Sequence, residues 1–283
     1  MKNFITRAIT GVLFVAIIVT CFLRPQAMIF LFAVITGMTL WEFCGLVNER
    51  DNVIVNRFIC TVAGVYFFLA MAGYAIGLTP ATVFIPYLLT ILYLFISELY
   101  AKQPDPIHDW AYTMLSQLYI ALPLSMINLL AFAPSTPEGP SVYNYLLPLS
   151  VFIFLWLNDT GAYCTGMMWG KHRLFERISP KKSWEGSIGG GIVSIVGAVV
   201  IALLTVPEGS DKLTHCLVWA GLALVVVVFG TLGDLVESLL KRTLGIKDSG
   251  NILPGHGGML DRFDSSLMAL PAAVVYWYSL SLL

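Results

Sequence analysis

Nine stretches of mostly apolar residues divide this sequence. Eight of them are long enough to cross a lipid bilayer as an α-helix, and the shortest, residues 8–23, is marginal. A spanning helix needs about 20 such residues. The stretches cover residues 8–23, 27–47, 58–78, 80–99, 110–132, 145–166, 187–206, 215–238 and 264–283. Hydrophobic residues make up 58% of the 283 and charged residues only 12%, which leaves too little polar surface to cover a water-soluble globule. The sequence therefore predicts an all-α integral membrane protein with about nine transmembrane helices.

Basic residues set the predicted orientation, because Lys and Arg gather in cytosolic loops. With the N-terminus inside, only Arg24 and Lys212 of the 16 basic residues lie on the outer side. We therefore predict a cytosolic N-terminus and a C-terminus on the outer side. The first apolar stretch is expected to be a retained span rather than a signal peptide, because no A-x-A pattern follows it.

A Pro-rich, nearly uncharged segment at residues 133–142 separates two halves. We expect residues 1–140 to form about five N-terminal spans and residues 141–283 to form a C-terminal catalytic region with two charged cytosolic loops. The net charge of −1 gives no reason to expect a nucleic-acid partner. The five cysteines form no CxxC pair and no Cys/His cluster, so neither a zinc site nor a disulfide framework is expected.

The two charged loops follow the sixth and the eighth spans, and the second of them begins with an acidic helix end. Asp234, Ser238 and Lys241 are spaced i, i+4 and i+7, so they lie along one helical face, with Glu237 beside them. A carboxylate deep in an apolar span is usually functional. The alternative is a solvated helix end whose Lys reaches toward the membrane surface.

Asp261 and Asp264 stand at the start of the ninth span, at spacing i, i+3. Two carboxylates at the expected depth of Asp234 would repel one another unless a cation lay among them. Oxygen ligands without Cys or paired His favour Mg²⁺, with Mn²⁺ as an alternative and a second cation as a further option. The competing interpretation is helix capping, since carboxylates are stabilised at a helix N-terminus.

A Gly-rich segment, residues 254–258, leads into the ninth span and could let backbone N–H groups approach a phosphate. A plain turn explains the glycines equally well. His256 within it is a candidate general base, phosphate donor or turn residue. Six basic residues lie near these carboxylates and glycines in the sequence. Basic residues, carboxylates and glycines together indicate a polyphosphate site. The preference of basic residues for cytosolic loops explains the six basic residues equally well. They are Lys181, Lys182, Lys241, Arg242, Lys247 and Arg262.

The second loop resembles the signature of the phosphatidate cytidylyltransferases, also called CDP-diacylglycerol synthases. The matching residues run from Ser238 through Lys241–Arg242 and Lys247–Asp248 to His256–Gly257–Gly258 and Asp261–Arg262–Phe263–Asp264. The segments 159–163 (DTGAY) and 179–186 (SPKKSWEG) resemble a second conserved stretch of that family. The resemblance covers roughly residues 155–265, and no charged position of the signature departs from the pattern.

The resemblance implies that phosphatidate attacks the α-phosphorus of CTP, giving CDP-diacylglycerol and pyrophosphate at the cytosolic face of the inner (plasma) membrane. On this hypothesis Asp234 and Asp261 hold the metal ion, with Asp264 as a further ligand, and Asp234, Asp261, Lys241 and Arg262 are the catalytic residues. The predicted partners are CTP, phosphatidate and the bilayer, with a homodimer left open. The predicted substrate-binding residues are Lys181, Lys182, Ser183, Glu185, Ser238, Arg242, Lys247, Asp248, His256, Gly257 and Gly258.

Two other functions were weighed against this one. A CDP-alcohol phosphotransferase would carry a D-G-x2-A-R…G-x3-D-x3-D pattern, whereas Leu235 follows Asp234 and no such run occurs elsewhere. A transporter would place ionisable residues near the middle of the bilayer, whereas here they gather at one face.

Overall fold

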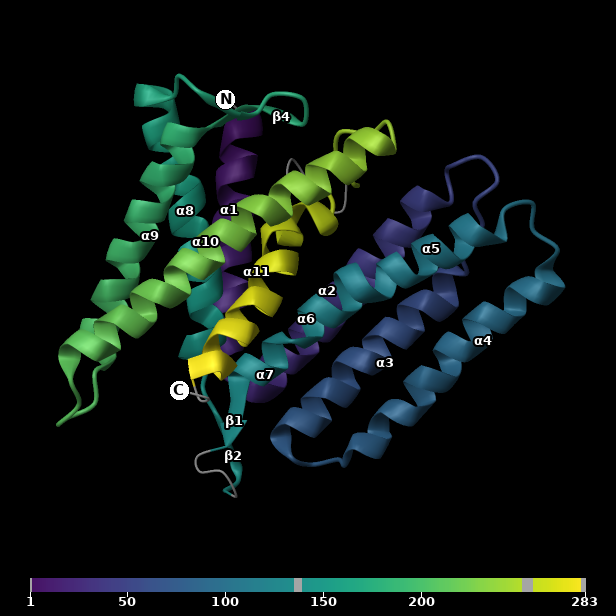
Figure 1. Ribbon diagram of the computed structural model, residues 1–283, viewed down its shortest axis with the longest axis horizontal. Helices are drawn as coiled ribbons and strands as arrows, with labels where there is room; N and C mark the ends of the chain where they lie inside the picture. The colour runs from purple at the N-terminus through teal and green to yellow at the C-terminus, as the bar shows by residue number, and fades with distance from the viewer. Residues whose placement is uncertain (1, 135–138, 251–256, 281–283) are drawn as a thin grey trace. The chain divides into compact units, whose positions relative to one another are not determined.

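The computed structural model describes residues 2–134, 139–250 and 257–280, and these are predominantly helical (Figure 1). The strands among the described residues form two short antiparallel pairs, β1 with β2 and β3 with β4. The chain divides into two units, one made of residues 1–146 and 243–263 and the other of residues 147–242 and 264–283.

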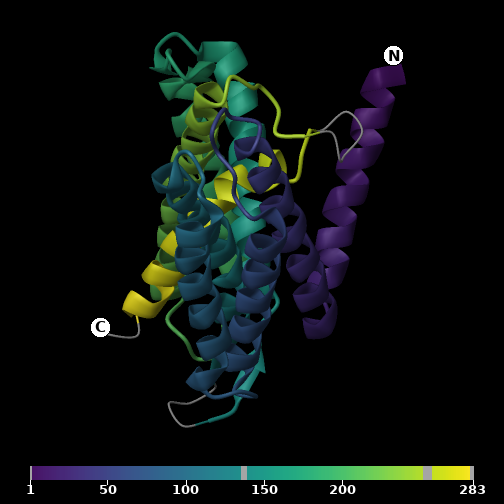
Figure 2. The ribbon, with the colours of Figure 1, turned by 90° about the vertical axis from the view of Figure 1, so that its right-hand side faces the viewer.

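The first unit is a group of helices that pack side by side. Figure 1 and the turned view in Figure 2 both show α2, α3, α4 and the α5–α7 segment running alongside one another. Its elements are α1 (Lys2–Phe22), α2 (Pro25–Val47), α3 (Arg57–Ile76), a 3₁₀ turn η1 (Ala81–Phe84), α4 (Ile85–Ala101), α5 (Pro106–Ser116), a π-helical turn η2 (Gln117–Ala121), α6 (Leu122–Ser125), α7 (Ile127–Ala131), β1 (Phe132–Pro134) and β2 (Ser141–Tyr143).

Rings fill the core of the first unit where α1 and α2 meet the chain that returns at residue 263. The ring centroid of Phe32 lies 5.5 Å from that of Phe22 and 6.0 Å from that of Phe263. Phe263 also meets Phe14 edge-on at 5.8 Å. Edge-to-face contacts of this kind stabilise beyond the area they bury. The first turn of the last helix is therefore fixed within the N-terminal unit.

The second unit contains α8 (Leu146–Trp169), β3 (Arg173–Phe175), β4 (Ser179–Ser183), α9 (Trp184–Thr205), α10 (Lys212–Thr243) and the greater part of α11 (Leu260–Leu280). Helices α8 and α9 approach closely because glycines face one another. A methyl group added at Gly161 would lie 2.9 Å from the backbone of Gly190. Ser194 then donates to the backbone carbonyl of Phe154 at 2.9 Å. Small residues allow such close helix packing in a bilayer.

Helices α10 and α11 are joined in the same manner. A methyl group at Gly233 would lie 2.9 Å from the carbonyl oxygen of Asp264, so no larger residue fits there without movement. At the other end Tyr276 donates its hydroxyl to the carbonyl of Val218 at 2.8 Å. This packing fixes the height of Asp264 on α11 relative to α10.

Seven helical segments among the described residues are long and apolar enough to cross a membrane, which confirms an α-helical, multi-pass membrane protein. They are Pro25–Val47, Arg57–Ile76, Ala81–Ala101, Pro106–Ala131, Leu146–Trp169, Trp184–Thr205 and Lys212–Thr243. The predicted first and ninth spans are also helical, as α1 and α11, but neither is among these seven. Three charged residues in the first turns of α11 (Asp261, Arg262 and Asp264) lower its apolar character. The count of nine spans stays a prediction.

The sixth predicted span contains three residues that are not apolar, Asn158, Asp159 and Gly161. Helix α8 continues through all three to Trp169. Polar side chains do not break a helix whose backbone hydrogen bonds are made, and Gly161 is required there by the approach of α9.

Candidate functional site

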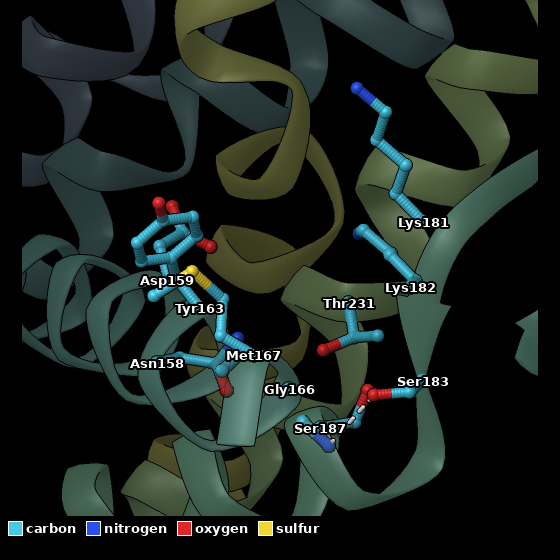
Figure 3. A pocket seen from close by; sticks show the side chains of 12 residues that line it. Asn158, Asp159, Tyr163, Gly166, Met167, Lys181, Lys182, Ser183, Ser187 and Thr231 are labelled. Carbon is cyan, nitrogen blue, oxygen red and sulfur yellow. Dashed lines mark hydrogen bonds between the residues drawn. The ribbon is translucent and has the colours of Figure 1, made fainter. Parts of the chain in front are cut away.

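A cavity of about 390 Å³ opens at one end of the second unit, among α8, β4, α9 and α10. Figure 3 shows Lys181 and Lys182 on one side of it and Asp159, Tyr163 and Met167 on the other. This volume falls in the range of small-molecule sites, about 300–1,000 Å³. The lining residues are Asn158, Asp159, Ala162, Tyr163, Gly166, Met167, Lys181, Lys182, Ser183, Gly186, Ser187 and Thr231.

The two lysines are held by a hairpin that runs directly into a helix. Strand β4 pairs with β3, with Arg173 opposite Ser183. Ser183 is the N-cap of α9 and its hydroxyl accepts a hydrogen bond from the backbone N–H of Gly186 at 3.1 Å. A serine at this position is a strong start signal for a helix. The predicted residues Lys181, Lys182 and Ser183 are therefore brought together at one cavity wall.

Lys182 forms an ion pair with Asp234 of α10, and their side chains are 28% and 27% exposed. Ser238, one turn further along α10, donates to Asp234 at 3.2 Å. Asp234 and Ser238 thus lie on one face of α10, as predicted. Lys182, from the other charged loop, contacts Asp234 there. An ammonium held beside a carboxylate at a cavity edge can bind an anion and orient a cation at the same place.

Asp264 lies near charged groups of both signs in the second unit. Those with the largest effect on it are the carboxylates of Asp234 and Asp159 and the ammonium of Lys182. Within the described part of the chain, no group of three or more His, Cys, Asp and Glu side chains is close enough to form a ready-made metal site. The donors present are nonetheless carboxylate oxygens with an excess of negative charge, which suits a hard divalent cation in donor chemistry.

Glu185, a predicted substrate ligand, holds the hairpin instead of lining the cavity. Its carboxylate accepts the backbone N–H groups of Lys171 at 3.2 Å and of His172 at 3.2 Å. It also lies 2.6 Å from Nδ1 of His172. These contacts fix the segment that leads from α8 into β3, so Glu185 acts on the cavity through the position of β4.

Lys241 belongs to the predicted stripe but its ammonium faces a different carboxylate. It lies 2.7 Å from Glu237, whose side chain is fully buried. A buried carboxylate needs such a partner, since an unpaired charge is costly to bury. The next residue, Arg242, is exposed at the end of α10. The predicted contacts of Lys241 and Arg242 with phosphate stay predictions.

In the first unit, Asp261 organises the turn that precedes α11. Its carboxylate accepts the backbone N–H groups of Ser249 and Gly258, both at 2.9 Å, and its own N–H donates to the Ser249 hydroxyl at 3.3 Å. Gly257 has φ of +80°, where side chains are strained, and a methyl group there would lie 2.5 Å from the Asp261 carboxylate. Asp261 therefore fixes the turn that leads into α11, which begins at Leu260. Its role as a metal ligand, and its predicted pairing with Asp234 of the other unit, stay predictions.

Glu42 of α2 is the most important residue that sequence reasoning did not commit to. It is buried, and it accepts the hydroxyl of Ser249 and the backbone N–H groups of Met259 at 2.7 Å and Leu260 at 3.2 Å. A methyl group at Gly258 would lie 2.0 Å from this carboxylate. The glycines of the signature thus let the chain approach two of its own carboxylates. A Glu inside a predicted apolar span was the available signal.

The remaining predicted residues lie in the same returning segment. Lys247, Asp248 and Arg262 are exposed, and their predicted contacts with phosphate or cation stay predictions. The predicted role of Gly257 and Gly258 in nucleotide binding also stays a prediction. His256 lies outside the described residues.

Nine of the twelve residues that line the cavity were not among the predicted site residues, and they include Asp159, Tyr163, Met167 and Thr231. Asp159 and Tyr163 belong to the DTGAY segment that carries part of the family resemblance, and that was the signal for them. Their spacing of four residues places both on one face of α8. Met167 and Thr231 are ordinary apolar or small residues of a span, and nothing in the sequence distinguishes them.

A family model described as the cytidylyltransferase family matches residues 5–280. The chain belongs to this family. Relatives called phosphatidate cytidylyltransferase include one from Staphylococcus aureus (strain COL), 44% identical over 163 residues, and one from Staphylococcus haemolyticus, 40% identical over 163 residues. Each match covers 58% of this chain and 57% of the relative. A protein of the same name from Staphylococcus epidermidis is 42% identical over 165 residues. The matched part is thus little more than half of each protein.

Proposed function

We propose that this cytidylyltransferase transfers CMP from CTP to phosphatidate, giving CDP-diacylglycerol and pyrophosphate for phospholipid synthesis. One observation carries the proposal: the cavity sets Lys181, Lys182 and the Lys182–Asp234 ion pair against Asp159 at the end of apolar helices. A nucleoside triphosphate and a lipid phosphate are both polyanions that need such cations. The names of the relatives agree with this substrate pair.

In the proposed reaction a phosphate oxygen of phosphatidate forms a bond to the α-phosphorus of CTP. The bond from that phosphorus to the oxygen bridging to the β-phosphate breaks, and pyrophosphate leaves with the bonding electrons. A phosphate monoester has a second pKa of about 6, by analogy with phosphoserine, so the nucleophile is largely ionised at neutral pH. The reaction then needs positioning and charge neutralisation more than a dedicated base.

The side chains of the cavity have separate tasks in this scheme. Lys181 and Lys182 neutralise the phosphates, and Ser238 keeps Asp234 oriented through its 3.2 Å hydrogen bond. Mg²⁺, or Mn²⁺ in its place, would be held by Asp234 and Asp261 with Asp264 as a further ligand, and would neutralise charge that develops on the phosphates. We add Asp159 to these proposed metal ligands because its charge acts on Asp264. A second cation is part of the same proposal.

The reaction is proposed to take place at the cytosolic face of the inner (plasma) membrane. Nine spans with the N-terminus inside would put both charged loops in the cytosol, where CTP is found. The lipid phosphate would meet them at the membrane surface. A homodimer stays a prediction.

The test uses the full chain, purified in detergent and returned to lipid. CTP and phosphatidate are supplied together and singly, with Mg²⁺ and with excess chelator, while pyrophosphate and the lipid product are followed. We expect pyrophosphate and CDP-diacylglycerol in equal amounts, only with both substrates and the metal ion. Pyrophosphate release without phosphatidate, or no product under any of these conditions, would overturn the proposal.

A further inference from the structure

The β3–β4 hairpin joins two helices that are long and apolar enough to cross a membrane. Helix α8 ends at Trp169 and α9 begins at Trp184, and Figure 1 shows β4 at that end of the second unit. The side chains of the two tryptophans are 61% and 55% exposed. Exposed tryptophans at the ends of spans are typical of the membrane–water interface. The hairpin therefore leaves the bilayer and returns to it at one surface.

The register of the hairpin keeps it close to that surface. Arg173 lies opposite Ser183, the N-cap of α9, so Arg173 is level with the start of the span. Phe175, two residues further along β3, lies with Trp184 and Ile188 of α9 around one apolar hollow. Two residues of a strand extend about 7 Å. A charged surface acts over roughly 8 Å at physiological salt, so β3 lies within its reach.

Three basic side chains of the hairpin face water without a partner. Lys171, Arg173 and Arg177 are exposed, and their side chains form no ion pair or hydrogen bond with any residue in the ranges 2–134, 139–250 and 257–280. Of the two acidic residues in this segment, Glu185 accepts backbone N–H groups of the hairpin itself. That leaves three cations against the carboxylate of Glu176. The preference of basic residues for the cytosol explains their presence but does not require them to be unpaired.

The hairpin holds these cations in a fixed arrangement. The backbone N–H of Trp184 donates to the carbonyl of His172 at 3.0 Å, and that of Ile178 donates to the carbonyl of Phe175 at 3.3 Å. The Ile178 side chain is buried beneath the turn. A surface that is already ordered loses little freedom when a ligand binds, so more of the interaction energy is left for binding.

We propose that the β3–β4 hairpin is a docking surface for anionic phospholipid headgroups of the leaflet that it borders. Lys171, Arg173 and Arg177 donate to lipid phosphates, and the two tryptophans pack beside the glycerol backbones. A soluble acidic protein fits this surface less well, because the cations lie within one screening length of the membrane. The surface is separate from the cavity lined by Lys181 and Lys182, and the inference goes beyond the proposed function.

The test measures lipid contact at the hairpin and needs no turnover. An environment-sensitive dye is attached to Glu176→Cys in the full chain without its five native cysteines. The protein is placed in discs of phosphatidylcholine bilayer that contain brominated phosphatidylglycerol or brominated phosphatidylcholine, which quench the dye on contact. Phosphatidylglycerol is a phosphodiester and cannot take the part of phosphatidate in the proposed reaction. Discs expose both leaflets, so the result does not depend on the orientation of the chain.

We expect phosphatidylglycerol to quench with at least about fivefold higher apparent affinity than phosphatidylcholine, since each basic residue near an anionic surface contributes roughly that factor. High salt should abolish the preference. The combined variant Lys171→Gln, Arg173→Gln and Arg177→Gln should lose it. A control with Arg24→Gln and Lys212→Gln, at two exposed basic residues elsewhere, should retain it.

Equal quenching by the two lipids in the unmodified protein would overturn the proposal, and so would a preference that survives high salt or the three substitutions. The salt titration uses the unmodified hairpin, so it decides even if the combined variant does not fold. A dye response to soluble polyglutamate as strong as that to phosphatidylglycerol would assign the surface to acidic proteins and would overturn the proposal as well.

Discussion

The residue that links the two charged loops is Lys182. Its ammonium pairs with Asp234 while its neighbour Lys181 reaches into the same cavity. Both members of the pair are about a quarter exposed, so water screens part of their attraction and the pair adds little to stability. In the proposed reaction, the pair would place one cation and one carboxylate where substrate and metal ion meet.

Replacing Lys182 with methionine keeps most of the side-chain volume and removes the charge. We expect kcat/KM for CTP to fall by about 10²-fold, as when one preorganised electrostatic group is removed from an active site. Lys212→Met, at an exposed lysine at the other end of α10, serves as the control and should retain activity. Activity of Lys182→Met within twofold of the unmodified protein would remove Lys182 from the site.

Asp261→Asn tests the acidic residue of the first unit. The amide keeps an oxygen that can accept from Ser249 and Gly258 but loses the charge a metal ion needs. We expect CDP-diacylglycerol formation in membranes to fall at least about 10²-fold with little change in thermal stability. Asp51→Asn, at an exposed residue of a loop, is the control. Near-normal activity would leave Asp261 only the role of fixing the turn before α11.

At the scale of elements, the most informative contact joins α2 to the start of α11. Glu42 accepts hydrogen bonds from one hydroxyl and two backbone N–H groups of the segment that carries the family signature. Backbone N–H groups at a helix N-terminus have no partner within the helix, and a carboxylate satisfies them well. A role for the N-terminal half follows: it supplies the carboxylate that holds the signature segment in place.

Glu42→Gln is expected to weaken this clamp. An amide presents one accepting oxygen and an NH₂ group that cannot accept from the surrounding donors, so a buried donor is left without a partner at a cost of about 1–3 kcal/mol. We expect a lower unfolding temperature in detergent together with lower activity. Glu49→Gln, at an exposed residue just beyond α2, is the control. Equal unfolding temperatures for Glu42→Gln and the unmodified protein would contradict the clamp.

The sequence predicted the helices better than the site, and particular residues show why. Apolar length alone found the helices now bounded at Pro25–Val47 and Lys212–Thr243, because a span is a property of one segment. The pairing of Lys182 with Asp234 joins residues 52 positions apart, and no local pattern encodes it. Thr231 and Met167 carry no chemical signal of their own. Glu42 was not predicted, because its partners are mostly backbone groups, which every sequence position possesses.

At the scale of the whole molecule, the predicted orientation decides which substrates reach the charged loops. It depends on charge asymmetry, since only Arg24 and Lys212 of the 16 basic residues fall on the predicted outer side. Nine spans and seven spans both leave the termini on opposite sides. The measurement needed is therefore on which side of the membrane β3 and β4 lie.

Single cysteines can report that side in intact cells. Ser210→Cys, in the exposed turn before α10, should react with a membrane-impermeant maleimide from outside. Glu176→Cys, exposed between β3 and β4, should react only after the membrane is opened. The background carries Cys21, Cys44, Cys60, Cys164 and Cys216 replaced by serine or alanine. Labelling of Glu176→Cys in sealed cells would reverse the orientation.

Helix α10 has 32 residues, so it measures about 48 Å, well beyond the roughly 30 Å of bilayer hydrocarbon. Asp234 stands 22 residues from its first residue, Lys212, about 33 Å along the rod. A helix that is longer than the hydrocarbon core tilts, and its tilt changes as the bilayer becomes thinner or thicker. Lipid composition would then set the height of Asp234 against the headgroups. The proposed enzyme would then have a preferred membrane thickness, and its rate would depend on the same lipids that its product goes on to supply.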